Sequence, residues 1–409
     1  MFLRLRGIVY GGMGKVFFWV TFLERRDRMK KRRHILLFLL LCLPLAFSDR
    51  GSRNADAALK ASGDWMYSVL QDGTVEIQGY TGKVRELRIP ETIDGKIVTT
   101  VSNVNGIDLY EGSAVESLEI PSGITRISKD AFWLCGNLKT ISVSPDNKKY
   151  DSRKNCNAVI ETATNTLVLG CDGTKIPSEV TKIGENAFKY SAGLERITIP
   201  SGVTAIGEEA FYACEKLQSI EIPSGTKSIG PSAFGFCRAL KKIAIPNTVK
   251  RIGSGAFIFC TNLQSVTIPS SVKRISRETF IYCKNLKKVV ISEGVTEIGA
   301  EAFVDCEKLK SVRMPSSLKI IRNQAFGACT ALRKITIPSG VTKIGWSAFE
   351  FCYRLKYITI KSKKLKTVGI DALEDIRKNA VIKVPKGKRK TYRKLFSPRT
   401  GYRKTMKIK

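Results

Sequence analysis

Leu194-Glu-Arg-Ile-Thr-Ile-Pro-Ser-Gly-Val-Thr-Ala-Ile-Gly-Glu-Glu-Ala-Phe-Tyr-Ala-Cys214 is one copy of the repeat that decides the fold of this 409-residue chain. Phenylalanine returns every 23 residues, at Phe188, Phe211, Phe234, Phe257, Phe280, Phe303, Phe326 and Phe349. Cysteine follows three residues later, at Cys214, Cys237, Cys260, Cys283, Cys306, Cys329 and Cys352, and Ser191 takes this position in the first copy. A fixed period of this kind predicts a solenoid in which each copy forms one coil.

The first half of the unit predicts a strand and a turn. Leu194, Ile197 and Ile199 have the spacing of residues that face one side of a short strand. Pro200 ends the strand because it has no N–H to donate to a neighbour. Gly207 is expected to allow a sharp bend after a second extended piece.

The second half of the unit predicts a compact turn. Ala210, Phe211 and Cys214 have spacings that suit one helical or 3₁₀ turn, with Phe211 pointing inward. One coil is too small to cover its own apolar side chains, but stacked coils can cover one another's.

These residues resemble the BspA-like leucine-rich repeats, whose pattern is I-P-x-x-V-x-x-I-G-x-x-A-F-x-x-C-x-x-L, over roughly residues 85 to 360. The resemblance implies an α/β solenoid that is predominantly β, curved and right-handed, with a parallel sheet on its concave face. It implies an N-terminal β cap at residues 58–88, secretion or surface display, and binding to host or matrix proteins.

The repeat spacing also sets the predicted domain boundaries. The solenoid is expected over residues 89–360, with a hairpin insert at about 145–175, because Phe132 and Phe188 lie 56 residues apart, two periods plus ten. Residues 361–409 carry 18 Lys and Arg against three acids, a net +15, and predict a basic C-terminal cap or tail. Within this region we expect a final strand at Val381–Pro385 and a helix over Lys386–Phe396 with Tyr392 and Leu395 inward.

The N-terminus reads as an export signal over residues 29–57. A basic cluster at 29–34 precedes a 13-residue apolar run at 35–47, and the small residues around Ala57 suit cleavage, with Ser48 as the second choice. Residues 1–28 fit such a peptide poorly, so we expect either an upstream extension before a true start at Met29 or an unusually long signal region.

Two further expectations follow from this segment. A lipid on Cys42 is a weaker alternative, because Leu41 is bulky for that kind of signal. No later run reaches 18 apolar residues, so no transmembrane helix is expected in the mature chain, which is predicted to be secreted or displayed at the cell surface.

Composition argues against an enzyme. The chain holds 69 Lys and Arg, 36 Asp and Glu and one histidine, His34, which lies in the segment predicted to be removed. A Ser-His-Asp triad, a Cys-His pair and a histidine metal site are therefore excluded from the mature chain. Acidic pairs such as Glu208 and Glu209 are not held in a visible pocket, and no catalytic residue, cofactor or metal is predicted.

The cysteines have two interpretations. The column of repeat cysteines is expected to be buried thiols and not a disulfide ladder, because stacked side chains run parallel about 4.8 Å apart. In the insert, Asn157–Glu161 and Thr166–Gly170 predict a hairpin in which Glu161 faces Thr166 and Ala158 faces Leu169. The same register places Cys156 opposite Cys171, which are either a disulfide or two reduced thiols.

The outward residues of the predicted concave sheet form two columns rich in Lys and Arg. They supply the candidate binding face, which consists of Lys241, Lys242, Lys287, Lys288, Lys310, Arg333, Lys334, Lys356 and Tyr357. A contiguous basic surface attracts polyanions. The expected partner of this monomer is an extracellular or host protein, or an anionic glycan or wall polymer, and not nucleic acid. The alternatives are a solvated face and a structural spacer of a surface layer.

A second set of side chains, the residues that precede the cysteine position, is aromatic in several copies. It consists of Tyr190, Phe236, Phe259, Tyr282 and Phe351. Packing at the corner between neighbouring coils is favoured over exposed stacking platforms for a ligand, since aromatic stripes are more often core than binding surface.

Overall fold

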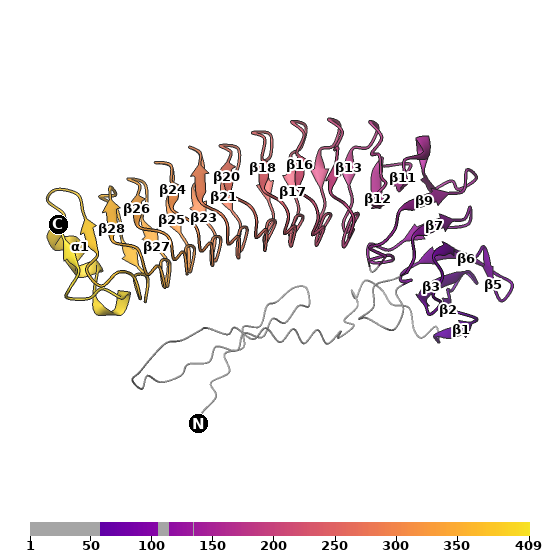
Figure 1. Cartoon of the computed structure of the whole chain (residues 1–409), viewed down its shortest axis with the longest axis horizontal. Helices are drawn as coiled ribbons and strands as arrows, with labels where there is room; N and C mark the ends of the chain where they lie inside the picture. The colour runs from indigo at the N-terminus through magenta and orange to yellow at the C-terminus, as the bar shows by residue number, and fades with distance from the viewer. Residues whose placement is uncertain (1–57, 105–113, 134) are drawn as a thin grey trace, which may run out of the picture. The chain divides into compact units, whose positions relative to one another are not determined.

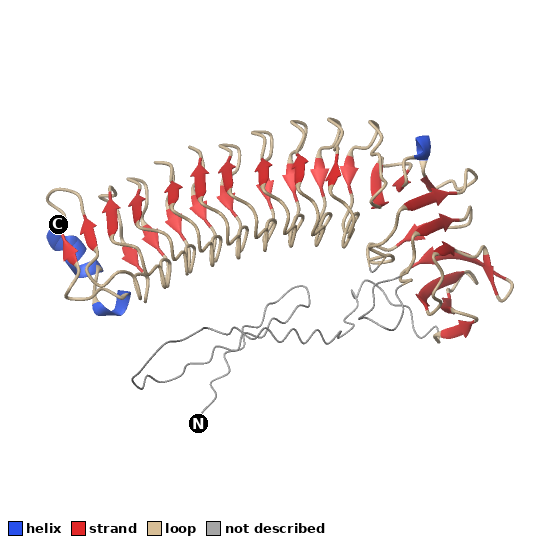
Figure 2. Ribbon diagram, viewed as in Figure 1, coloured by secondary structure: helices blue, strands red, loops and turns tan. Residues whose placement is uncertain are grey.

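The computed structural model describes residues 58–104, 114–133 and 135–409. The predicted upstream extension (1–28) and signal peptide (29–57) lie outside these residues. The described chain winds through successive coils, each of which contributes a pair of short strands (Figure 1). Strands and loops make up nearly all of it, and its one α-helix has seven residues (Figure 2). The predicted solenoid, predominantly β with parallel strands, is confirmed.

The first strands of the coils form three parallel sheets. One sheet contains β4 (Glu86–Arg88), β7 (Ser117–Ile120) and β9 (Thr140–Val143). The next contains β14 (Arg196–Ile197), β16 (Ser219–Glu221), β18 (Lys242–Ala244), β20 (Ser265–Ile268), β22 (Lys288–Ile291) and β24 (Ser311–Arg313). The last contains β26 (Lys334–Ile337), β28 (Tyr357–Ile360), β30 (Val381–Lys383) and β31 (Lys407–Ile408).

The second strands of the coils form two further parallel arrays. One contains β13 (Lys182–Ile183), β15 (Ala205–Ile206), β17 (Ser228–Ile229) and β19 (Arg251–Ile252). The other contains β21 (Arg274–Ile275), β23 (Glu297–Ile298), β25 (Ile320–Ile321), β27 (Lys343–Ile344) and β29 (Thr367–Val368).

The N-terminal end and the insert add antiparallel pairs. The N-terminal sheet has the order β1 (Lys60–Ser62), β2 (Trp65–Val69), β3 (Val75–Tyr80), β6 (Lys96–Val101) and β5 (Thr92–Ile93), with β8 (Arg126–Ile127) on β6. The insert holds β10 (Tyr150–Asp151), the 3₁₀ helix η1 (Arg153–Asn155), β11 (Ala158–Glu161) and β12 (Thr166–Gly170). Because β12 pairs in parallel with β13, the hairpin extends the second-strand sheet.

The C-terminal segment covers the last coil. Helix α1 (Arg389–Leu395) buries Tyr392 and packs Leu395 against the core, as predicted. The predicted strand at 381–385 forms as β30, but β31 follows it, so β30 is not the final strand. The backbone N–H of Leu373 donates to the carbonyl of Thr400, in the 3₁₀ helix η2 (Pro398–Thr400), over 2.9 Å. This segment therefore takes the place of the next coil's turn.

The eight repeat phenylalanines form one continuous stack inside the solenoid. Each is at most 1% exposed. Neighbouring rings lie 5.0–5.5 Å apart between centroids, with planes within 5° of parallel. Burial of one such side chain contributes roughly 1.5–3 kcal/mol. Every coil therefore depends on both neighbours to cover its phenylalanine.

The turn around each phenylalanine is not helical, contrary to the sequence prediction. In the coil quoted above, Glu209 and Ala213 have φ of 51° and 58°, in the left-handed region. As a result the N–H groups of Glu209, Phe211 and Ala213 all point toward the next coil. They donate to the carbonyls of Pro231, Ala233 and Gly235 over 2.7–2.9 Å. In a helix these N–H groups would donate to carbonyls of the same coil.

Gly207 has a role in close approach between coils that the sequence did not reveal. A Cβ atom at this position would lie 2.6 Å from the backbone of Gly184 in the preceding coil. Any side chain would push the two coils apart, so the glycine is needed for backbone contact.

A second aromatic column runs beside the phenylalanine stack, nearer the surface. Its members are Tyr190, Tyr212, Phe236, Phe259 and Tyr282, with centroids 4.4–5.8 Å apart. The predicted packing between coils is thus observed at Tyr190, Phe236, Phe259 and Tyr282, whereas Phe351 is 40% exposed. Asp305 occupies the next position after Tyr282, and burial, helped by the nearby Glu307, raises its pKa to about 6.

Replacement of one stacked phenylalanine tests the core. Phe257→Ala removes a ring that contacts both Phe234 and Phe280, and it should lower the free energy of unfolding by about 3–5 kcal/mol. Gln264→Ala, at an exposed position just before strand β20, should change it by no more than about 0.5 kcal/mol. Urea unfolding followed by circular dichroism gives both values; equal effects would contradict the stacked core.

Replacement of the buried carboxyl at 305 should stabilise the protein in a pH-dependent way. Its folded pKa lies above the ordinary 3.8, so the ionised carboxylate is disfavoured in the folded state above about pH 6. Asp305→Asn should therefore raise the free energy of unfolding by about 1–3 kcal/mol at pH 7.5, and the gain should vanish as the pH falls to 4. Asp146→Asn, at an exposed site, is the control. A gain that is the same at both pH values would refute the assignment.

Candidate functional site

The candidate site is a strip of cations on the outward face of the first-strand sheets. We use the name basic strip for Lys241, Lys242, Lys287, Lys288, Lys310, Arg333, Lys334 and Lys356. All are exposed except Lys356, which is half-buried. They lie at or just before the start of strands β18, β22, β24, β26 and β28, where the inward side chains of the same strands enter the core.

Strand pairing brings these residues into line. In the ladder, Lys242 pairs with Ser265, Ser265 with Lys288, and Lys288 with Ser311. Further along, Lys334 pairs with Tyr357. Stacked side chains therefore follow one another at about one strand spacing, ~4.8 Å. The structure thus places the sequence-predicted candidates on one continuous surface column or on the column beside it.

The basic strip differs from the loops beside it in its ion pairs. Cations on the loops nearby are paired: Lys284 lies 3.0 Å from Glu307, and Arg238 lies 3.3 Å from Glu215. Across residues 58–104, 114–133 and 135–409, by contrast, no cation of the basic strip forms an ion pair with a carboxylate. Its positive charge therefore remains available to a ligand.

One end of the basic strip carries an aromatic ring. Tyr357 is 50% exposed, and the Nζ atom of Lys356 lies 5.1 Å from the centroid of its ring. A cation in this position is attracted by the ring's quadrupole. Tyr357 thus presents a ring and a charge side by side at the surface.

Two cavities lie where the insert interrupts the first-strand sheets. One, of about 200 Å³, is lined by β9 with Ser152, Asn155 and Asn157. The other, of about 320 Å³, is lined by Thr174, Lys175, Ile176, Arg196, Ile197, Thr198 and Pro200. Neither lining contains a carboxylate, a thiol or an imidazole.

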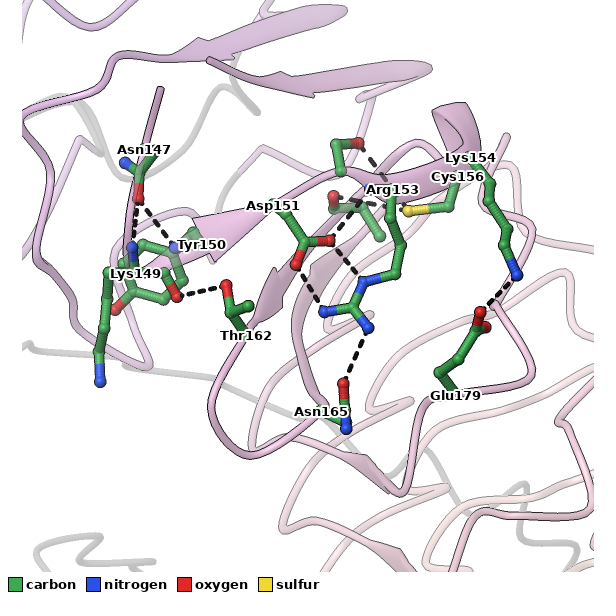
Figure 3. A network of polar contacts seen from close by, with 12 residues as sticks. Asn147, Lys149, Tyr150, Asp151, Arg153, Lys154, Cys156, Thr162, Asn165 and Glu179 are labelled. Atoms are coloured by element: carbon green, nitrogen blue, oxygen red, sulfur yellow. Dashed lines mark hydrogen bonds and ion pairs between the residues drawn. The ribbon is translucent and has the colours of Figure 1, made fainter. Parts of the chain in front are cut away.

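A polar network holds the insert in place (Figure 3). The guanidinium of Arg153 donates to Asp151 over 2.5 and 2.7 Å and to Asn165 over 2.8 Å. Asp151 is held as a carboxylate by this arrangement, since Arg153 lowers its pKa despite partial burial. Lys154 pairs with Glu179 on the following loop. Because every charge here has a partner, the network serves structure and not ligand binding.

The hairpin register differs from the prediction beyond its first two pairs. Glu161 faces Thr166 and Ile160 faces Leu167, but a bulge between Val159 and Ile160 places Ala158 opposite Gly170 instead of Leu169. The side chain of Cys156 consequently packs into the solenoid core, while that of Cys171 packs with the N-terminal coils. Both are free thiols in the structure, which does not form the candidate disulfide.

The repeat cysteines are buried free thiols, as predicted, but each also has a bonding role that the sequence did not reveal. The Sγ atom of each lies 3.0–3.3 Å from the carbonyl oxygen of the phenylalanine 26 residues earlier, in the preceding coil. The thiol donates to this oxygen. Burial raises the pKa of Cys237, Cys260 and Cys283 well above the ordinary 9.0, so these groups stay protonated.

Sequence reasoning missed a lysine held among aromatic rings beside the insert. The Nζ atom of Lys189 lies 5.5–5.8 Å from the ring centroids of Trp133, Tyr190 and Tyr212. It also pairs with Glu209 over 2.6 Å, and its side chain is only 9% exposed. Trp133 and Lys189 are 56 residues apart, and only the departure from the 23-residue spacing hinted that their coils are neighbours.

The fold and the surface define the class of protein, a leucine-rich repeat solenoid with a basic sheet face. A family model described as the BspA type leucine-rich repeat region matches residues 96–164, 170–287 and 273–401, in six copies. The chain belongs to this family.

Several solved structures are similar to the chain. A leucine-rich cell surface protein from Faecalibacterium prausnitzii is 24% identical, with 87% of this chain and 95% of that chain covered and a TM-score of 0.47. A leucine-rich repeat protein from Bacteroides ovatus is 26% identical (86% and 99% covered, TM-score 0.46). The pneumococcal vaccine antigen PcpA is 19% identical (86% and 98% covered, TM-score 0.49). No curated protein matches the chain.

Among the residues that the structure describes, no helix has the length and apolar character needed to cross a bilayer. Within the same parts of the chain, no three His, Cys, Asp or Glu side chains gather as ligands for a metal ion.

Thiol chemistry tests the buried column and the hairpin together. At pH 8 the folded protein should react with Ellman's reagent at none of its ten described cysteines, because all are buried. In guanidinium chloride all ten should react. Rapid reaction in the folded state would contradict the buried column. Mass spectrometry of the unreduced protein should show free thiols at Cys156 and Cys171; a linked peptide would restore the disulfide.

Proposed function

We propose that this chain is a non-catalytic binding scaffold, exported or displayed at the cell surface, whose basic strip holds an anionic extracellular partner. The observation that supports this most is the line of eight exposed or half-exposed cations, none of which pairs with a carboxylate in the described parts of the chain. Two unit charges 4 Å apart repel by about 1 kcal/mol even in water, and a bound polyanion relieves that repulsion.

The partner classes follow from the charge and the predicted compartment. An anionic glycan or wall polymer, or an acidic patch on a host or matrix protein, would each complement the basic strip. The predicted signal at 29–57 supports export, and the structural neighbour from Faecalibacterium is named a leucine-rich cell surface protein. A structural spacer of a surface layer is the alternative, and it would need no free charge on this face.

Neutralising the basic strip tests the proposal. Lys241, Lys242, Lys287, Lys288, Arg333 and Lys334 are replaced together by Gln, and retention on immobilised heparin and on an acidic protein array is measured. Binding should weaken by about tenfold or more, since each exposed charge contact contributes about 0.2–1 kcal/mol. The remaining affinity of the wild type should fall with added salt.

A matched control removes the same charge elsewhere. Lys182, Lys250, Lys273, Lys319, Lys343 and Lys366 are exposed on or beside the second strands, and their replacement by Gln should leave binding nearly unchanged. If both six-fold variants lose binding equally, net charge and not the basic strip is responsible. If neither loses binding, the basic strip is not the site.

A further inference from the structure

We infer that the basic strip binds a linear acidic glycan that runs along the stacking direction of the coils, with one disaccharide for every two coils. This rests on the proposed function and names its ligand class. The inference comes from the order of side chains along the strip, which total charge alone does not explain.

One of the two surface columns alternates strictly. From β18 to β28 it reads Lys242, Ser265, Lys288, Ser311, Lys334 and Tyr357. The ladder holds the first four in direct register, and β24 contacts β26, where the column continues. Lysines in this column are therefore two strand spacings apart, about 9.6 Å. The neighbouring column is more continuously basic and adds charge without imposing a period.

This spacing suits the repeat of an acidic disaccharide polymer. Each sugar ring in an extended glycan advances the chain by about one strand spacing, so a carboxylate or sulfate on every second ring meets every second coil. The hydroxyls of Ser265 and Ser311 can donate and accept hydrogen bonds, and they face the intervening rings. A polyphosphate has charges much more closely spaced, and it gains nothing from alternate serines.

The aromatic residue at the end of the column also favours a glycan ligand. Tyr357 presents a half-exposed ring, held beside Lys356, directly in line with the lysines. The apolar C–H face of a sugar ring can stack on an aromatic ring, whereas a phosphate or a carboxylate side chain offers no such face. An acidic protein surface has no reason to repeat its charges at two-coil intervals.

A charge-neutral rearrangement separates spacing from total charge. In the full chain, Ser265→Lys and Lys288→Ser are combined, which keeps the total charge but leaves the lysines of this column one and three coils apart instead of two. Both positions are exposed, so the core is untouched, and an unchanged melting temperature verifies this. The probes are hyaluronan fragments of defined length, which carry a carboxylate on every second ring, together with polyphosphate and polyglutamate. The wild type should prefer hyaluronan, with affinity that rises for each added disaccharide.

The rearranged variant should bind hyaluronan about tenfold more weakly and polyphosphate within about twofold of the wild type. Tyr357→Ala should weaken glycan binding alone, and Tyr357→Phe should retain it because the ring remains. Equal glycan binding by the rearranged variant and the wild type would overturn the inference and leave the proposed function standing. Equal preference for polyphosphate or polyglutamate would overturn it as well. Loss of the proposed function itself would appear as full binding to every probe by the six-fold Gln variant.

Discussion

Contact between neighbouring coils is the constraint on which the rest of this molecule depends. A 23-residue coil cannot cover its own phenylalanine, and the stack from Phe188 to Phe349 shows how the neighbours do so. The same contact explains the backbone. Residues with a left-handed φ on either side of each phenylalanine direct the N–H groups of the turn to the next coil. Glycines such as Gly207 let the backbones of neighbouring coils approach. The N-terminal strands and the segment around α1 then cover the two ends.

This arrangement separates stability from recognition. Inward positions of each coil are fixed by packing, while the outward positions of the same strand are free to vary. Because the strands pair in register, equivalent residues of successive coils lie in a straight line on the surface. A repeat protein can therefore acquire a linear binding surface by changing single residues at intervals of one period. The alternation from Lys242 to Tyr357 is a pattern that such a scaffold can present.

Much of the fold could be predicted from spacing, because periodicity reports directly which side chains face a shared interior. The buried phenylalanines and the thiol column follow from it, and the inward Tyr392 follows from the helix expected over residues 386–396. The turn conformation could not be predicted, since Glu209 and Ala213 have no preference for a positive φ and adopt it only to bond to the next coil. The bulge at Val159 depends on packing against two different cores. The sequence could place the residues of the basic strip in line. It could not show that none of them pairs with a carboxylate in the described parts of the chain, because ion pairing depends on the three-dimensional structure.

Hydrogen exchange of the turn amides tests the central claim, that coils are held by bonds and rings shared with their neighbours, most directly. The N–H groups of Phe211, Phe234, Phe257, Phe280, Phe303 and Phe326 each donate to the following coil, although they lie in turns without regular secondary structure. The account predicts slow exchange at these amides, with the strongest protection in the central coils. Exchange at the rates of exposed loops would show that the coils do not hold one another, and would contradict it.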